Sequence, residues 1–386
     1  MIYLDHAATT PVRREVLEAM WPYLTGDFGN PSSHHGLGES AAAAVRNARQ
    51  QLAEWLGCRE SEIIFTSGGT EADNLAIMGI ALASPRGKHI VTTAIEHPAV
   101  LESCAFLERH HGFEVTVVGV DESGLVAATD IAGAIRPDTT LVSVMLANNE
   151  VGTVQPVREI AALARAASVP VHTDAVQAAG WLDLGVNELG VDALSISGHK
   201  LGAPKGIGLL YLRGGMPLEP VLHGGGQERG RRSGTENVAG IVALAVAARL
   251  AEADRLERVA LTSLARDAFI DEVLATVPDA RLTGARTSRL AASASFCFPG
   301  TSGESVLLRL EERGITCSSG SACAAGSDDP SPVLLAMGID PGVAQTAVRF
   351  TLGSDTTAEQ LIGVAAEVRA AVAAVRSIGG TRQSPS

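Results

Sequence analysis

Short runs of apolar residues alternate with longer helical patterns through the first two-thirds of the chain, and this alternation constrains the fold most. Seven runs have the length and composition of buried strands: 62–65, 89–92, 115–118, 141–144, 169–172, 193–196 and 207–212. Helical patterns lie between them, for example at 70–83, 99–110 and 157–166. Strands and helices that alternate at this spacing predict an α/β fold with a mostly parallel seven-stranded sheet. Ligands of such sheets bind at the carboxyl ends of the strands.

The last third of the chain predicts a second, smaller domain. A helical pattern from Glu236 to about Val277 is longer than an ordinary globular helix, so it either links two domains or is broken once. Four segments then read as strand, helix, strand and helix: 292–298, 303–313, 346–352 and 357–375. We predict a large domain over 12–256 and a small α+β domain formed by 1–11 and 257–376. The small and polar residues 377–386 predict a disordered tail.

Composition and charge exclude several classes of function. Hydrophobic residues make up 46% of the 386 residues, which is enough for at least one large core. Acidic residues outnumber basic ones by 43 to 30, and this balance argues against a nucleic-acid-binding surface. The five cysteines form no C-x-x-C pair, the amino terminus lacks the pattern of a secretory signal, and the longest apolar run, 238–248, is too short for a bilayer. We therefore expect a soluble cytoplasmic protein with no membrane partner.

Lys200 ends a Ser-Gly-His-Lys sequence directly after a predicted buried strand. In isolation, such a lysine is most simply a surface residue at a strand end. Asp174 changes this interpretation, because a carboxylate that follows a buried strand has few structural uses unless it is paired. A lysine that forms a Schiff base needs an anion site beside it, and a buried aspartate can hold a pyridinium nitrogen. The two residues together predict a site for pyridoxal phosphate, with Gln177 within reach of the phenolic oxygen.

Further polar groups follow other predicted strands at the same edge of the sheet. Gly69 and Thr70 come between a strand and a helix, where free N–H groups make an anion cradle, although an ordinary turn capped by Thr70 explains the pattern about as well. His97 could stack on a flat ring and move protons, and Asn149 offers an amide. A lone histidine is more often structural. Polar groups at the ends of four predicted strands are nevertheless hard to explain as turns.

Several motifs in order along the chain resemble those of cysteine desulfurases of the NifS/IscS type. They are YLDHAATT at 3–10, GNPSS at 29–33, EH at 96–97, NNEVG at 148–152, DAVQ at 174–177, SGHK at 197–200, GGGQERGRRSGT at 224–235 and SSGSAC at 318–323. The match covers about the first 370 residues and is highly specific as a set. The resemblance implies a fold-type I pyridoxal-phosphate enzyme of the class V aminotransferase family that works as a homodimer.

The resemblance also implies a role for each matching residue. Lys200 would hold pyridoxal phosphate covalently, with Asp174 on the ring nitrogen and Gln177 on the phenolic oxygen. The phosphate would lie against Gly69, Thr70, Ser197 and His199, and Thr235 would complete its site from the neighbouring subunit. Asn149 and Arg349 would orient the substrate carboxylate, and His97 would manage protons.

Arg349 and Cys323 would bring the predicted small domain to this site. Arg349 lies in an apolar strand, where an unpaired guanidinium is costly, so it binds either a substrate carboxylate or an acid of its own domain. Cys323 lies among small polar residues, which are typical of a mobile, exposed loop. A thiol on such a loop can reach into a pocket, attack a bound substrate, and move out again with the transferred group.

The other four cysteines carry no predicted catalytic role. Cys58, Cys104 and Cys297 fit the pattern of small buried hydrophobes. Cys317 adjoins the predicted loop and is either structural or a resolving thiol. No histidine pattern supports a metal site with Cys317 and Cys323, so we predict no resident metal, although Cys323 could be a transient iron–sulfur ligand.

The resemblance implies that the chain takes sulfur from L-cysteine. Lys200 would remove the Cα proton, and Cys323 would attack the substrate sulfur to give L-alanine and a persulfide on Cys323. The sulfur would pass to an acceptor protein, an iron–sulfur scaffold or a tRNA-thiolation enzyme. Three alternatives stay open: a selenocysteine lyase, an aminotransferase of the same fold that needs no loop cysteine, and a scaffold that keeps the fold but only binds partners.

Overall fold

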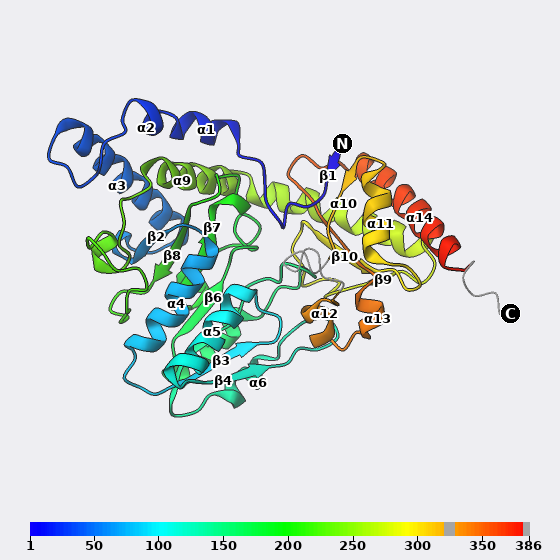
Figure 1. The fold of residues 1–386 in the computed structure, drawn as a ribbon, viewed down its shortest axis with the longest axis horizontal. Helices are drawn as coiled ribbons and strands as arrows, with labels where there is room; N and C mark the ends of the chain where they lie inside the picture. The colour runs from blue at the N-terminus through cyan, green and yellow to red at the C-terminus, as the bar shows by residue number, and fades with distance from the viewer. Residues whose placement is uncertain (320–328, 381–386) are drawn as a thin grey trace.

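A seven-stranded sheet lies at the centre of the larger part of the molecule (Figure 1). The computed structural model describes residues 1–319 and 329–380. In spatial order the strands are β2 (Ile63–Thr66), β8 (Gly208–Leu212), β7 (Ala193–Ser197), β6 (Val171–Asp174), β5 (Thr139–Ser143), β3 (His89–Thr93) and β4 (Glu114–Val118). Neighbours from β7 to β4 are parallel, whereas β8 runs antiparallel to both β2 and β7. The predicted mostly parallel seven-stranded α/β sheet is confirmed.

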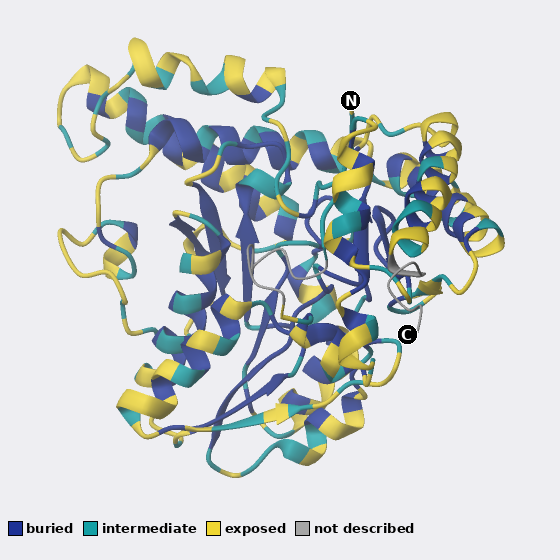
Figure 2. Ribbon diagram, turned by 45° about the vertical axis from the view of Figure 1, so that its right-hand side comes forward, coloured by how far each residue is buried: buried dark blue, intermediate teal, exposed yellow. Residues whose placement is uncertain are grey.

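Side chains alternate along the strands and divide between two helical layers. Phe65, Val142 and Leu194 pack into a core with α3 (Gly36–Leu56), α7 (Val157–Ala166) and α9 (Val238–Ala253). Ile64, Leu141 and Leu210 pack on the opposite face with α4 (Gly69–Ala83) and α5 (Pro98–His111). Figure 2 shows these strands as buried ribbons between the helices. Strands of this kind end in loops at one edge of the sheet, which is where we expect the site.

The strand predicted at 169–172 differs from the observed one by two residues at each end. It begins at Val171, because Pro170 has no N–H to donate to a neighbouring strand. It ends at Asp174, so this carboxylate is the last residue of the strand and does not follow it. Asp174 is thereby fixed by the sheet itself.

The helical pattern after residue 236 is broken once, as predicted. Helix α9 ends at Ala253, Asp254 leaves helical geometry with φ −116° and ψ 10°, and α10 (Arg255–Thr276) begins directly afterwards. Figure 1 shows α10 running from the large sheet to the smaller part of the molecule, beside the amino terminus.

The smaller part is built on a three-stranded antiparallel sheet with the order β12 (Ala347–Thr351), β10 (Ser293–Cys297) and β9 (Arg281–Leu282). Helix α11 (Gly303–Glu311) follows β10, and α14 (Ala358–Gly380) follows β12, so the predicted order of strand, helix, strand and helix is confirmed. Phe269 of α10 packs edge-on against Phe296 and Phe350, with ring centroids 6.0 and 5.3 Å away. The exact domain boundaries stay a prediction.

The amino terminus belongs to this smaller core. Strand β1 (Ile2–Tyr3) pairs in parallel with β11 (Ile315–Thr316), and Leu4 is fully buried in the same core. The remaining helices are α1 (Arg14–Met20), α2 (Pro22–Thr25), α6 (Ala128–Ala134), α8 (Val186–Leu189), α12 (Pro332–Ala336) and α13 (Pro341–Ala344). In the part of the chain that the structure describes, no helix is both long and apolar enough to cross a membrane.

Helix α14 continues to Gly380, so residues 377–380 are helical and not part of a disordered tail. The side chain of Arg376 explains the difference, because its guanidinium donates hydrogen bonds to the carbonyl oxygens of Pro299 and Pro278 at 2.7–3.1 Å. These bonds hold the last turns of the helix against the smaller core. Residues 381–386, the rest of the predicted tail, lie outside the described residues.

A buried ion pair ties the segment after β8 to the large sheet. Arg49 of α3 donates two hydrogen bonds to the Glu228 carboxylate, at 2.9 and 2.6 Å, and a third to the carbonyl oxygen of Ile63. Glu228 also accepts the N–H of Phe65, and its side chain is only 3% exposed. Removing one partner of such a pair leaves a buried charge without compensation.

We expect Arg49→Ala to lower the free energy of unfolding by about 3–5 kcal/mol, because the Glu228 carboxylate loses its cation. Urea denaturation measures this change. Arg14→Ala is the matched control: Arg14 pairs with Glu18 in solvent, and its loss should change little. Equal effects of the two substitutions would show that the buried pair does not hold this segment in place.

Candidate active site

Ten of the predicted site residues line one cavity of about 310 Å³ at the carboxyl ends of the parallel strands. They are Gly69, Thr70, His97, Asn149, Asp174, Gln177, Ser197, His199, Lys200 and Arg349. The strand ends bring them together, since β6 ends at Asp174 and β7 ends at Ser197. Thr235 does not line it, and Cys323 lies outside the described residues.

Lys200 lies in a short 3₁₀ turn, Gly198–Lys200, directly after β7. Its ammonium donates hydrogen bonds to the carbonyl oxygens of Ala7 and Ala8, the latter at 2.8 Å. The side-chain amide of Gln177 donates to the same Ala7 oxygen at 3.0 Å. The amino-terminal segment therefore holds the ends of Lys200 and Gln177 at one place in the cavity.

Asp174 is a buried carboxylate, only 6% exposed. Its Oδ1 accepts the N–H of Val176 at 2.8 Å. Burial raises the pKa of Asp174, while that hydrogen bond and the charges of His97 and Lys200 lower it in part. A buried carboxylate of this kind is costly unless a cation faces it, and a protonated ring nitrogen is such a cation.

The predicted anion cradle forms where β2 meets α4. The helix begins at Gly69 with Gly68 as its N-cap, so Thr70 lies in the first turn and does not cap it. A Cβ added at Gly69 would lie 2.7 Å from a methyl group of Val176 and 3.3 Å from Cβ of Ser197. Only glycine fits this close to the two side chains, and the first residues of α4, at the positive end of the helix dipole, line the cavity.

His199 adds a neutral donor beside this cradle. Its Nδ1 lies 3.1 Å from the hydroxyl of Thr9, and burial together with the charges of Lys200 and Lys205 lowers the pKa of His199 to about 4. At neutral pH the imidazole is therefore uncharged in the absence of an anion. It can donate one N–H to a phosphate oxygen.

His97 has a structural use as well as a place in the cavity. It is the N-cap of α5, and its Nδ1 accepts the N–H of Ala99 at 3.1 Å. Burial lowers the pKa of His97, with Asp174 acting in the opposite direction. Because Nδ1 accepts this bond, Nε2 is the nitrogen that is left to carry a proton towards the cavity.

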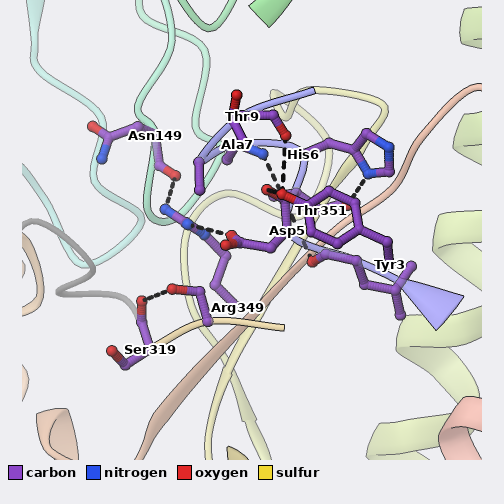
Figure 3. Close-up of polar contacts among 12 residues, drawn as sticks. Tyr3, Asp5, His6, Ala7, Thr9, Asn149, Ser319, Arg349 and Thr351 are labelled. Carbon is purple, nitrogen blue, oxygen red and sulfur yellow. Dashed lines mark hydrogen bonds and ion pairs between the residues drawn. The ribbon is translucent and has the colours of Figure 1, made fainter. Parts of the chain in front are cut away.

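Arg349 reaches the cavity from β12 and joins three distant parts of the chain (Figure 3). Its guanidinium donates to the backbone carbonyl oxygen of Asn149 at 2.9 Å and to the Asp5 carboxylate at 2.8 Å. The ion pair with an acid of its own domain, one of the two predicted alternatives, is thus present. Arg349 is 2% exposed, and its Nε has no hydrogen-bond partner among the described residues. The guanidinium is therefore held in place by two partners, while its Nε–H has no partner among the described residues.

Cys323 lies outside the described residues, but the described residues on either side of its segment contact the region of Asn149 and Arg349. On the amino-terminal side, Ser318 exchanges two backbone hydrogen bonds with Arg349, at 2.7 and 3.2 Å. On the carboxyl-terminal side, the hydroxyl of Ser331 donates to the carboxylate of Glu150, the residue after Asn149. The chain therefore enters and leaves this segment beside two of the predicted substrate-binding residues.

The four described cysteines are poor nucleophiles. Burial is the main cause that raises the pKa of each thiol, to about 12 for Cys58, Cys104 and Cys317 and to about 11 for Cys297. Cys104 and Cys297 are buried as predicted, whereas Cys58 is half-buried. Among the described residues, no three His, Cys, Asp or Glu side chains are grouped so that they could hold a metal ion.

Sequence reasoning missed several residues of this site. Asp5 and the Ala7 and Ala8 carbonyl groups contact Arg349 and Lys200, and Asp73 lines the cavity one turn after Thr70. Asp5, Ala7 and Ala8 lie in the amino-terminal motif, but a sequence does not show which backbone carbonyl groups contact a side chain. The spacing of three residues from Thr70 was a usable signal for Asp73, since it places both on one face of a helix.

Comparisons with known proteins place this geometry in a family. Residues 2–363 match the family model described as Aminotransferase class-V. A relative named cysteine desulfurase IscS from Dictyoglomus turgidum is 50% identical over 364 residues, which are 93% of this chain and 91% of that protein.

Comparisons with solved structures lead to the same family. A NifS-like protein superposes with a TM-score of 0.90 at 36% identity and covers 96% of this chain and 99% of its own. A structure described as SspA in complex with cysteine has a TM-score of 0.79 at 38% identity and covers 91% and 99%. The chain therefore belongs to the class-V aminotransferase family, among the cysteine desulfurases of the NifS/IscS type.

Proposed function

We propose that this chain binds pyridoxal phosphate in the 310 Å³ cavity and moves the sulfur of L-cysteine onto Cys323. The observation that carries the proposal is the contact of the described residues on either side of the Cys323 segment with this region: Ser318 bonds Arg349, which lines the cavity, and Ser331 bonds Glu150, the residue after Asn149. Members of the family depend on pyridoxal phosphate in general, and the residues at this site fit that cofactor.

The fit is specific for each part of the cofactor. Asp174 would face the ring nitrogen, Gln177 the phenolic oxygen, and Lys200 the aldehyde carbon. Gly69, Thr70, Ser197 and His199 would hold the phosphate, since all four line the cavity where α4 begins and β7 ends. When bound, pyridoxal phosphate withdraws electrons from the substrate's Cα, which makes the proton on Cα acidic.

The protein's own residues would orient the substrate and move its protons. Arg349 is held by Asp5 and the Asn149 carbonyl, and its Nε, which has no partner among the described residues, would bind the substrate carboxylate, with the Asn149 amide as a second donor. The Lys200 amine becomes free when the substrate takes its place, and it then accepts the Cα proton. His97, through Nε2, holds or returns a proton at the substrate sulfur or amine.

Cys323 would carry out the sulfur transfer. Its thiolate attacks the substrate sulfur, and the S–S bond forms as the Cβ–S bond breaks. The electron pair of that bond stays with the organic fragment, which takes a proton at Cβ and leaves as L-alanine. The product is a persulfide on Cys323, and an acceptor protein for iron–sulfur assembly or tRNA thiolation would take the terminal sulfur. Such a thiol must be reduced, so we expect the protein in the cytoplasm.

We also propose a homodimer in which Thr235 completes the partner's phosphate site. Thr235 is exposed and does not line the cavity of its own protomer. Large apolar side chains are exposed near it and on or between α1 and α2: Leu17, Trp21, Leu24, Val221 and Leu222. A second copy of the chain would cover them. The boundaries 12–256 for the large domain and 1–11 with 257–376 for the small one remain our proposal.

We expect Arg349→Lys to raise KM for L-cysteine by about tenfold or more with a smaller change in kcat, because lysine keeps the charge but loses the planar fork that meets a carboxylate. Steady-state kinetics of alanine formation measure both constants. Arg309→Lys, at an exposed arginine of α11, is the matched control and should leave KM unchanged. An unchanged KM in Arg349→Lys would remove Arg349 from the substrate site.

A comparison of substrates separates the proposal from a selenocysteine lyase. We expect kcat/KM for L-cysteine to exceed that for L-selenocysteine, because attack by a protein thiol is needed only when sulfur must be taken from cysteine. A preference for L-selenocysteine that survives the loss of Cys323 would reverse the assignment.

A further inference from the structure

The Arg349 guanidinium has a counter-ion that belongs to its own chain. Its Nη2 donates to Oδ1 of Asp5 at 2.8 Å, and the side chains of Arg349 and Asp5 are only 3% and 17% exposed. Figure 3 shows the guanidinium between the Asp5 carboxylate and the Asn149 carbonyl group. Arg349 lines the cavity whereas Asp5 does not, so Asp5 can influence a ligand only through the cation that it pairs with or through its own charge.

The position of Asp5 is fixed by its backbone and not by its carboxylate. Asp5 forms a parallel β-bridge with Thr351, at the end of β12. The hydroxyl of Tyr3 donates to the carbonyl oxygen of Asp5 at 3.0 Å, and the N–H of Ala8 donates to the same oxygen at 3.0 Å. An amide in place of the carboxylate would leave all of these contacts intact.

The other charged groups near Arg349 do not replace this pair. Burial raises the pKa of Glu150 to about 7, and the carboxyl of Glu150 accepts the Ser331 hydroxyl and does not line the cavity. Lys200 would be bonded to the cofactor in the holoenzyme. The pair of Arg349 and Asp5 therefore sets the charge that the carboxylate of a ligand meets at this end of the cavity.

A guanidinium that is already paired with a carboxylate is close to a neutral unit. A ligand carboxylate that binds it becomes the second anion on one cation, and the two anions repel each other in a site with little water. An α-amino acid carries an ammonium group on the same carbon as its carboxylate, so it brings a cation of its own. A simple carboxylate does not, and it meets the repulsion without compensation.

We propose that Asp5 is a specificity-determining residue that acts through Arg349: its charge lowers the affinity of the cavity for carboxylates that lack an amino group and leaves the affinity for zwitterionic α-amino acids almost unchanged. The inference rests on the proposed function, in which Arg349 binds the substrate carboxylate. Discrimination of this kind comes from a repulsive element directed against the wrong ligand. If Asp5 only held the guanidinium in place, its loss would weaken the binding of both classes of ligand.

Propionate and L-alanine test this inference, because propionate is L-alanine without its amino group. The holoenzyme is titrated with each ligand by calorimetry at one neutral pH and one low ionic strength. Asp5→Asn keeps an oxygen that can accept the hydrogen bond from Nη2 but removes the charge. We expect this variant to bind propionate about tenfold more tightly, while its Kd for L-alanine changes by less than about threefold.

Asp355→Asn is the matched control. Asp355 is exposed, follows β12 and does not line this cavity, so its substitution changes the net charge by the same amount and should alter neither Kd. Asp5→Ala should change the Kd for propionate in the same direction as Asp5→Asn, which covers a failure of one variant to fold.

Three results would overturn the inference. They are an unchanged or weaker affinity of the Asp5 variants for propionate, an equal gain in affinity for propionate and L-alanine, and the same gain in Asp355→Asn. Failure of the unaltered holoenzyme to form alanine from L-cysteine would instead overturn the proposed function, because the two titrations do not depend on turnover.

Discussion

Replacing Lys200 by alanine is expected to abolish both the covalent attachment of pyridoxal phosphate and alanine formation from L-cysteine. Lys200 is the only lysine among the described residues that line the cavity, and its ammonium is held there by the Ala7 and Ala8 carbonyl oxygens. No other lining residue offers an amine to bond the aldehyde carbon or to take the Cα proton. We expect a loss of activity of about 10⁴-fold or more, since the attachment and the proton transfer both fail.

The measurement is the visible absorbance of the purified chain before and after treatment with borohydride, together with the rate of alanine formation. Lys205→Ala is the matched control, because Lys205 is exposed, follows the same turn and does not line the cavity. It should keep the bound cofactor and most of the activity. Borohydride-fixed cofactor in Lys200→Ala would show that another amine forms the bond and would remove Lys200 from its role.

Replacing Cys323 by serine is expected to separate cofactor chemistry from sulfur transfer. The change lies on a segment outside the described residues, while every described residue that lines the cavity is untouched. The variant should therefore bind pyridoxal phosphate and L-cysteine with an unaltered affinity. A hydroxyl does not attack sulfur as a thiolate does, so we expect alanine formation to fall by about 10³-fold or more.

Cys317→Ser is the matched control for this substitution. Cys317 is close in sequence, but burial raises the pKa of its thiol to about 12, so it supplies almost no thiolate at neutral pH. This variant should form alanine at nearly the normal rate. If Cys317→Ser lost sulfur transfer while Cys323→Ser kept it, the nucleophile would be Cys317.

Much of the fold follows from local patterns, which is why the sequence predicts it well. The seven strands of the large sheet and the strand–helix order of the smaller part depend on apolar runs a few residues long, and these were placed to within a few residues. The tail was the exception, because the hydrogen bonds of Arg376 to Pro299 and Pro278 cross about 80 to 100 residues of sequence. No local pattern contains such a contact.

The candidate site also contains residues that local patterns predict and contacts that they do not predict. Asp174, Ser197 and Lys200 follow strands directly, so the rule for strand ends brings them together. The contact of Arg349 with Asp5 joins residues 344 positions apart, and the sequence could only offer an acid of the same domain as one alternative. The hydrogen bonds of His172 to Ser143 and Ser195 cross three strands, and predicting them needs the register of the sheet.

Mass spectrometry of the unaltered holoenzyme tests the central claim most directly. The protein is mixed with L-cysteine in the absence of an acceptor or reductant, alkylated and digested, and the alanine released is counted. The account predicts one additional sulfur atom on the peptide that contains Cys323 and one L-alanine for each sulfur bound. Alanine formed while that peptide gains no sulfur, or sulfur found on another cysteine, would contradict it.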